Sequence, residues 1–176
     1  MFYNVGSNAR TTRVAVGKVP TKAYRCWYAM LYRCYSGKKP EYVGCTVCEE
    51  WLDFDNFRPW FDNTHKDDWE LDKDLLGTGK LYSPATCVFV PKWLNQLLTF
   101  PKKPRNLPTG VYKGRTPGTF RAEIKLAGVP TNLGVFPCPD TAYAAWKQAK
   151  LEYINSRKPE LDAIDPRLHP AILAKL

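Results

Sequence analysis

The chain has 176 residues, of which 44% are apolar and 14% aromatic, which is enough for one ordinary domain or two small ones. No apolar run approaches the length of a membrane span, and the first residues lack the charged-then-apolar order of a secretion signal. We therefore expect a protein that is neither secreted nor membrane-spanning and that works in the cytoplasm.

The net charge is +9, but basic and acidic residues are unevenly distributed. Residues 1–50 hold eight Lys and Arg against three Asp and Glu, residues 51–100 hold five against eight, and residues 101–176 hold thirteen against six. Basic flanks are typical of a protein that binds nucleic acid by releasing counterions from phosphates. The acidic centre is costly in such a protein unless its carboxylates have a task, such as holding a cation.

Residues 1–19 are expected to form an extended basic arm or a disordered tail. Residues 20–35 are predicted to be a helix, because apolar residues recur at helical spacing and Ser36-Gly37 follows. Lys22, Arg25 and Arg33 lie off this stripe and are expected to face solvent. A short strand over 42–47 and a second aromatic helical stripe over 49–61 are predicted next.

Residues 63–68 form a polar connection that contains His65, one of only two histidines. A single histidine in a loop is usually an ordinary surface residue. His65 nevertheless precedes Asp72 by only a few positions, which makes it a candidate proton acceptor for chemistry there.

Residues 70–95 carry the densest chemical pattern in the chain. A strand ending at residues 71–74, a Gly77-Thr78-Gly79 turn, a strand over 86–90 and a helix beginning at Pro91 give a ββα unit. Alternation along the first strand would place Asp72 and Asp74 on one face and Lys73 on the other. With Asn95 from the helix, the two carboxylates would hold Mg²⁺ or Mn²⁺. In the alternative interpretation, they only cap a solvated turn.

The six cysteines are expected as thiols or metal ligands rather than as a disulfide framework. Cys45-x-x-Cys48 is half of a zinc motif, and a structural Zn²⁺ would need two further ligands, for which Cys34 and Cys87 are the candidates. The alternative is that these cysteines are small core residues.

A basic, proline-rich linker is predicted over 99–109, after a first domain at 1–98. The second domain, 110–156, has three short strands (111–113, 119–126 and 131–136) and a helix from Asp140 whose apolar face is expected to be Ala142, Ala145, Trp146, Ala149 and Tyr153. A sheet covered on one face by this helix leaves the other face for the major groove of double-stranded DNA. Residues 157–176 are a tail of short helical turns. The fold class is therefore α+β.

The second domain resembles the DNA-binding domain of the plant Apetala and ethylene-response-factor family, which also occurs in phage and bacterial homing endonucleases. The resemblance rests on Gly110-Val111-Tyr112, residues 120–124, 133–136 and 141–146. It implies a sheet laid in the major groove, and it assigns DNA contacts by position to these residues: Tyr112, Lys113, Arg115, Arg121, Glu123 and Lys125.

The first domain resembles phage-encoded HNH-type endonucleases, through residues 27–35, 47–57, 71–74 and 82–95. The resemblance implies a ββα unit that grips one metal ion, with Asn95 at the ligand position of the helix. Where that family has its histidine base, this chain has Lys73 or Asp74. A protonated Lys73 would stabilise phosphate charge, Asp72 and Asp74 would hold the metal, and His65 or Asp74 would accept the proton.

Together these features predict a phage-type, metal-dependent DNA endonuclease acting in the cytoplasm of a bacterial host. The competing predictions are a DNA-binding regulator without catalysis and a zinc-stabilised protein-interaction module.

Overall fold

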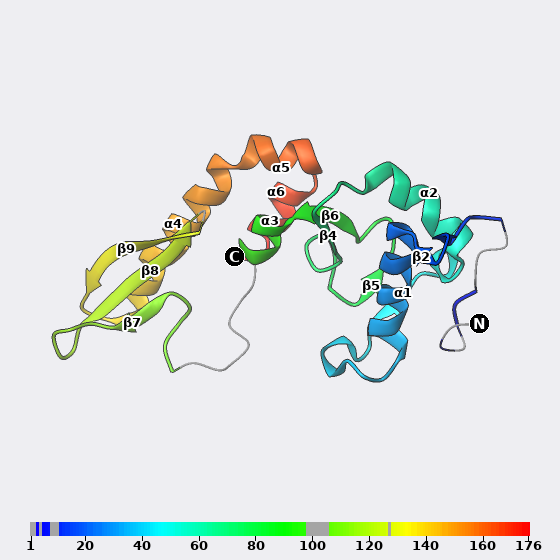
Figure 1. Cartoon of the computed structure of the whole chain (residues 1–176). Helices are drawn as coiled ribbons and strands as arrows, with labels where there is room; N and C mark the ends of the chain where they lie inside the picture. The colour runs from blue at the N-terminus through cyan, green and yellow to red at the C-terminus, as the bar shows by residue number, and fades with distance from the viewer. Residues whose placement is uncertain (1–2, 4, 8–10, 98–105, 127) are drawn as a thin grey trace. The chain divides into compact units, whose positions relative to one another are not determined.

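The computed structural model describes residues 3, 5–7, 11–97, 106–126 and 128–176 (Figure 1). The chain divides into two compact units, Met1–Asn95 and Gln96–Leu176. Helix makes up 42% and strand 23%, so the predicted α+β class is confirmed. Parts of the predicted N-terminal arm, and residues 99–105 of the predicted linker, lie outside the described residues.

The first unit mixes helices with short strands. Its elements in chain order are β1 (Ala15–Val16), β2 (Val19–Pro20), α1 (Lys22–Tyr35), the 3-10 helix η1 (Pro40–Tyr42), β3 (Thr46–Val47), the 3-10 helix η2 (Glu49–Leu52), α2 (Phe54–Thr64), β4 (Trp69–Asp72), β5 (Leu81–Tyr82), β6 (Val88–Pro91) and α3 (Lys92–Leu97), whose last two residues belong to the second unit. β3 pairs with β5 in parallel, and β1 pairs with β2 antiparallel.

Helix α1 forms where helical periodicity predicts it, and its start is fixed by Thr21, whose hydroxyl accepts the Tyr24 amide. The predicted stripe is buried: Trp27, Met30 and Leu31 are fully enclosed. The Trp27 indole donates to the Trp51 carbonyl over 2.7 Å, which joins α1 to η2. The aromatic stripe at 49–61 is split by Asp53, whose carboxylate caps α2 at the Asp55 amide.

β4 and β6 pair antiparallel from Trp69↔Pro91 to Asp72↔Val88, and α3 follows β6 directly. Two paired strands followed by a helix were predicted here, but β5 lies between β4 and β6 in the chain and pairs with β3. The first strand, however, ends at Asp72 and not at Asp74, because the Asp72 Oδ1 atom accepts the backbone amides of Asp74 and Leu75. Such a side-chain-to-backbone bond turns the chain out of the strand. The prediction that Asp72 and Asp74 share a strand face is therefore wrong.

In the second unit, β7 (Val111–Lys113), β8 (Phe120–Leu126) and β9 (Val129–Phe136) form the predicted three-stranded antiparallel sheet. β9 begins at Val129, where a turn was predicted. Between Ala122 and Glu123 the register shifts, and Leu133 in β9 has no strand partner. This bulge lets Leu133 and Phe136 both pack on the buried face.

One face of the sheet is covered by α4 (Pro139–Ser156) (Figure 1). The buried positions of α4 are Ala142, Trp146, Lys150 and Ile154, a strict i, i+4 series. The predicted face therefore holds for Ala142 and Trp146, but Ala145, Ala149 and Tyr153 are only half-buried. The predicted tail is ordered as α5 (Lys158–Ile164) and α6 (Leu168–Leu173). Across the described residues, no helix is both long and apolar enough to span a bilayer.

Candidate functional site

A hollow of about 440 Å³ lies beside β4 in the first unit, and we call it the β4 hollow. Four residues predicted for catalysis or metal binding line it together: Asp72, Lys73, Asp74 and Asn95. Seven further lining residues were not predicted as site residues, and four of them carry a charge or a phenol: Arg33, Tyr42, Glu70 and Tyr82. The tertiary structure thus brings together most of the predicted first-domain site, and it adds a second cation, a third carboxylate and two phenols.

Asp72 sits at the end of β4 with 9% of its surface exposed. Its Oδ1 atom accepts the Asp74 amide over 2.7 Å and the Leu75 amide over 2.8 Å. Burial raises the pKa of this carboxyl, because a charged group is less stable away from water, while the two amides lower it. One oxygen of Asp72 therefore holds the backbone turn, which is the capping role in the alternative interpretation.

Lys73 is nearly enclosed, with 7% of its side chain exposed, whereas the side chain of Asp74 is 66% exposed. The two form an ion pair of 2.7 Å between Nζ and Oδ1. The Asp74 carboxylate also lies against Gly79, whose φ of +77° needs a residue without a Cβ. Lys73 thus places its ammonium group at the wall of the hollow, and Asp74 presents a carboxylate to solvent beside it.

Glu70 is the residue that sequence reasoning missed next to Asp72. It lies two positions earlier on β4, so alternation places Glu70 and Asp72 on the same face. The Asn95 Nδ2 atom donates to Glu70 Oε2 over 2.6 Å, which ties the start of α3 to β4. Strand alternation would have identified this pair had the end of the strand been placed at Asp72.

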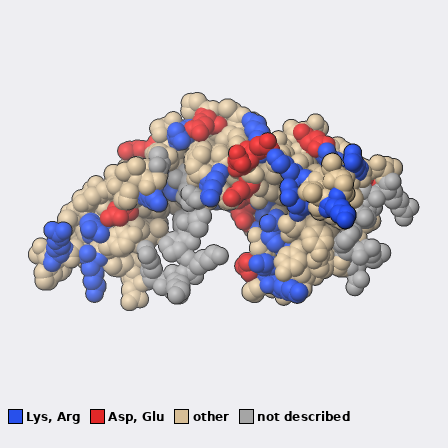
Figure 2. Space-filling view, viewed as in Figure 1, with Lys and Arg blue, Asp and Glu red and all other residues tan. Residues whose placement is uncertain are grey.

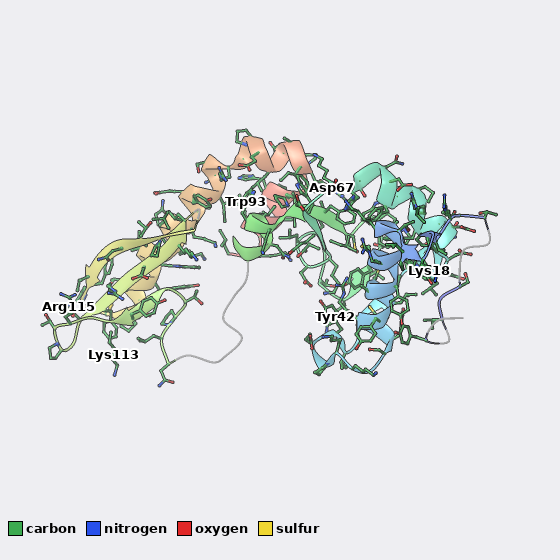
Figure 3. The ribbon with its side chains drawn as sticks, in the orientation of Figure 1. Lys18, Tyr42, Asp67, Trp93, Lys113 and Arg115 are labelled. Atoms are coloured by element: carbon green, nitrogen blue, oxygen red, sulfur yellow. The ribbon has the colours of Figure 1, made fainter. Side chains whose placement is uncertain are left out.

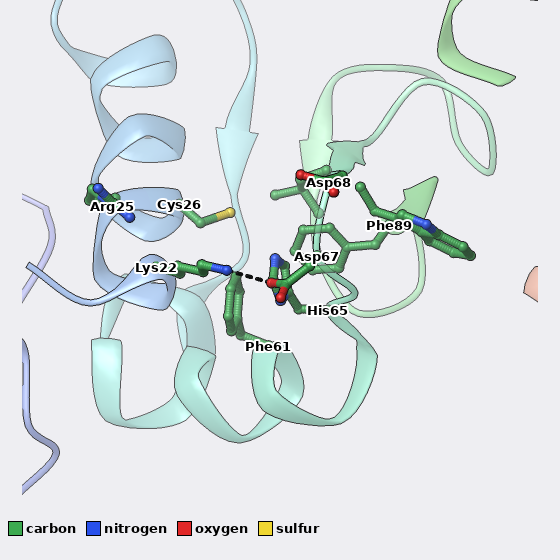
Figure 4. A pocket seen from close by; sticks show the side chains of 10 residues that line it. Lys22, Arg25, Cys26, Phe61, His65, Asp67, Asp68 and Phe89 are labelled. Atoms are coloured by element: carbon green, nitrogen blue, oxygen red, sulfur yellow. Dashed lines mark hydrogen bonds and ion pairs between the residues drawn. The ribbon is translucent and has the colours of Figure 1, made fainter. Parts of the chain in front are cut away.

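His65 does not line the β4 hollow. It lines a neighbouring hollow of about 320 Å³ together with Lys22, Asp67 and Phe61, and Figure 4 shows it there. Its ring stacks on Phe61 at a centroid separation of 4.4 Å and meets Phe89 edge-on at 5.2 Å. The Lys22–Asp67 ion pair, dashed in Figure 4, lies beside it. These contacts give His65 a packing role and separate it from the predicted catalytic residues.

The four candidate zinc ligands are free thiols, and Cys34 lies close enough to Cys45 for the two to interact electrostatically. Cys45 donates to the Gly79 carbonyl over 3.5 Å, and Cys87 is buried in the core. Burial raises the pKa of Cys34 to about 11 and that of Cys87 to about 12. Among the described residues, no three His, Cys, Asp or Glu side chains are placed to hold a metal ion.

The second unit presents a sheet face that α4 does not cover. Tyr112 on β7 lies opposite Arg121 on β8, and Arg121 lies opposite Val135 on β9. The Arg121 guanidinium is 5.6 Å from the centre of the Tyr112 ring, and it forms an ion pair of 3.4 Å with Glu123. Val135 is 62% exposed. Four of the predicted DNA-contacting residues share this face by strand alternation: Tyr112, Arg121, Glu123 and Lys125.

The remaining two predicted contacts, Lys113 and Arg115, lie at the β7–β8 turn and are exposed (Figure 3). Alternation places Lys113 on the opposite face of the sheet from Tyr112, so Lys113 does not share the open face with the four residues above. Figure 2 shows basic side chains over this end of the sheet. Tyr112 and Arg121 therefore lie side by side on the open face, and Lys113 and Arg115 add positive charge at one end of the sheet. Such a combination is suited to contacts with a nucleic-acid backbone and its bases.

No protein-family model matches this chain, and neither a curated protein nor a solved structure is similar enough to it to count as a match. The resemblance to HNH-type endonucleases and to Apetala-type domains therefore stays a prediction, which rests on the motifs alone.

Proposed function

We propose that the chain is a metal-dependent DNA endonuclease, in which the open sheet face binds double-stranded DNA and the β4 hollow hydrolyses a phosphodiester bond. The observation that carries this proposal is the gathering of Glu70, Asp72, Asp74 and Lys73 at one hollow of a strand–strand–helix unit. Phosphodiester hydrolysis needs a negative group that accepts the proton of the attacking water and a positive group that stabilises charge on the phosphate. Carboxylates next to an ammonium group supply both.

The roles of the residues follow from their exposure. Lys73, held by Asp74 and enclosed by the wall, places positive charge where the phosphate oxygens become more negative. Asp74 is exposed and is the carboxylate that accepts the proton of the attacking water. Asp72 keeps the turn that positions both of them, through its two backbone amides.

The donors at the hollow fit Mg²⁺ or Mn²⁺ in kind, because these ions prefer carboxylate and carbonyl oxygens. Glu70, Asp72 and Asn95 would hold the ion, and Glu70 with Asn95 would have to share their present hydrogen bond with it. When bound, the ion supplies an activated water and neutralises charge on the phosphate.

A second candidate function is DNA binding without cleavage. The observation that favours it is the engagement of Asp72 by two backbone amides at 9% exposure, which leaves this carboxylate with a structural task. In that case the β4 hollow of the first unit would not cleave DNA, and the sheet of the second unit would carry the DNA-binding function.

The test is incubation of supercoiled plasmid with the purified chain and Mg²⁺ or Mn²⁺, beside Glu70→Gln and Asp74→Ala. Asp62→Asn is the matched control, because Asp62 is an exposed carboxylate of the same unit that pairs with Arg58 on α2. We expect metal-dependent nicking by the wild type and by the control, and its loss in both hollow variants. Intact DNA with every protein, together with salt-sensitive DNA binding, would favour the second candidate instead.

A further inference from the structure

Arg33, in the last turn of α1, was expected to face solvent but is held inside the β4 hollow. Its guanidinium carbon lies 5.7 Å from the ring centres of both Tyr42 and Tyr82. Its Nε atom is buried, and among the described residues it has no hydrogen-bond partner. A buried donor without a partner destabilises the fold, so a group that accepts a hydrogen bond there would be favoured.

Lys73 approaches the same two rings from the turn after β4. Its Nζ atom is 5.2 Å from the centre of Tyr42 and 5.6 Å from the centre of Tyr82. Two cations from distant parts of the chain therefore share one pair of aromatic rings. The Cys34 thiol also lies near both, since each of the two charges lowers its pKa against the larger effect of burial.

The charges of these two cations are not equally compensated. Lys73 has its ion pair with Asp74, whereas Arg33 forms no ion pair with any residue that the structure describes. Like charges held close together repel, and a guanidinium in a partly enclosed site gains most from an anion that it can grip with several N–H groups. A phosphate group has the geometry for this, because its oxygens accept two parallel bonds from one guanidinium.

We infer that Arg33 and Lys73 form a binding site for a phosphate group of the nucleic-acid backbone, with Tyr42 and Tyr82 orienting the two cations. The inference deepens the proposed endonuclease function and rests on it for the choice of DNA as the source of the phosphate. The phosphate then lies in the hollow that also holds Glu70, Asp72 and Asp74. Arg33 is thus the residue that holds the phosphodiester beside the carboxylates.

The direct test is the Nε–H resonance of Arg33 in the full ¹⁵N-labelled chain, assigned by its absence in Arg33→Gln. We expect the signal to shift saturably with inorganic phosphate and with a short DNA duplex. Lys73→Gln should raise the half-saturating concentration about tenfold, the usual effect of losing one charge-assisted contact. Arg25→Gln, which removes an exposed charge from the same helix, should leave the shift unchanged.

An Arg33 signal that moves with neither probe, or that responds equally in Lys73→Gln, would overturn the inference. A shift with free phosphate and none with DNA would overturn the assignment to the nucleic-acid backbone. Arg33→Lys keeps the positive charge but loses the planar guanidinium that can donate two parallel hydrogen bonds. It should fold as the wild type does and bind phosphate more weakly. This variant keeps the test informative if Arg33→Gln does not fold.

Plasmid nicking separates this inference from the function on which it rests. We expect Arg33→Gln to lose nicking while it still binds DNA through the sheet. Nicking by Arg33→Gln at the wild-type rate would overturn the inference and leave the endonuclease proposal standing. A DNA-induced shift of the Arg33 signal in a chain that cuts no DNA would support the phosphate site and refute the endonuclease.

Discussion

Gly110 lies against the indole of Trp146, so closely that a Cβ at position 110 would overlap the ring. Gly110 has a φ of +78°, and its carbonyl accepts the Glu123 amide over 2.8 Å, at the point where the sheet register shifts. The entry to β7, the bulge and the helix α4 are therefore joined at one glycine. Because Trp146 lies on the buried face of α4, this contact fixes how the helix covers the sheet.

Replacing this glycine should destabilise the second unit. We expect Gly110→Ala to cost about 2–4 kcal/mol, from the positive φ and from the overlap with Trp146. Gly118→Ala is the matched control, because Gly118 has a φ of +79° but open space around its Cα, so only the backbone cost of about 1–2 kcal/mol remains. Urea unfolding followed by circular dichroism measures both, and equal midpoints for the two variants would contradict the packing argument.

Asp72 should make stability depend on pH in a defined direction. Burial raises its native pKa above the ordinary 3.8, so the folded chain keeps this proton to a higher pH than the unfolded chain does. The contribution of Asp72 to stability therefore falls as pH rises from about 3.8 through the native pKa. We expect Asp72→Asn, which keeps an oxygen acceptor for both amides, to gain stability relative to the wild type over this pH range.

Urea midpoints between acidic and neutral pH measure this effect. Asp72→Ala is the complementary variant, because it leaves the amides of Asp74 and Leu75 without their acceptor and should cost about 1–3 kcal/mol. An advantage of Asp72→Asn that grows as pH falls would show that the carboxylate is stabilised, and not penalised, by its surroundings.

The open sheet face should govern DNA affinity. We expect Arg121→Ala to weaken binding to a DNA duplex and to reduce the slope of log affinity against log salt by about 0.9 if the arginine contacts a phosphate. If Arg121 reads a base edge instead, affinity should fall by about 1–3 kcal/mol with the slope unchanged. Lys147→Ala removes an exposed charge from α4 and is the control. Equal affinities for Arg121→Ala, Lys147→Ala and the wild type would remove this face from DNA binding.

Cys138 should be the first thiol to react. The Thr141 side chain and amide lower its pKa, whereas burial raises the pKa of Cys26 and Cys34 to about 11 and that of Cys87 to about 12. Since the thiolate is the nucleophile, we expect iodoacetamide at neutral pH to modify Cys138 fastest, and Cys138→Ser to abolish the fast phase. Peptide mass spectrometry measures the order of modification.

The same experiment tests the zinc interpretation. If Cys34, Cys45, Cys48 and Cys87 are core and surface thiols, added Zn²⁺ should leave their alkylation rates unchanged. Slower alkylation of all four in the presence of Zn²⁺ would instead support the predicted zinc site.

The sequence by itself determined the elements whose signal is periodic and local. Helix α1 and the sheet of the second unit follow from apolar spacing, because the burial of a stripe or a strand face is dictated by neighbours only a few residues apart. The same kind of signal predicted paired strands before a helix within residues 69–97, although Pro91 ends β6 and the helix begins at Lys92.

Only the tertiary structure decided which side chains meet in the hollow. The hydrogen bond from the Asp74 amide to the Asp72 carboxylate ends β4 at Asp72. The carboxylate that shares the strand face with Asp72 is therefore Glu70 and not the predicted Asp74. Arg33, which was predicted to face solvent, lies against the rings of Tyr42 and Tyr82. His65, which was predicted to act with Asp72, lines a different hollow. These outcomes depend on contacts between segments that are far apart in the chain. The spacing of apolar residues within one segment carries no information about such contacts.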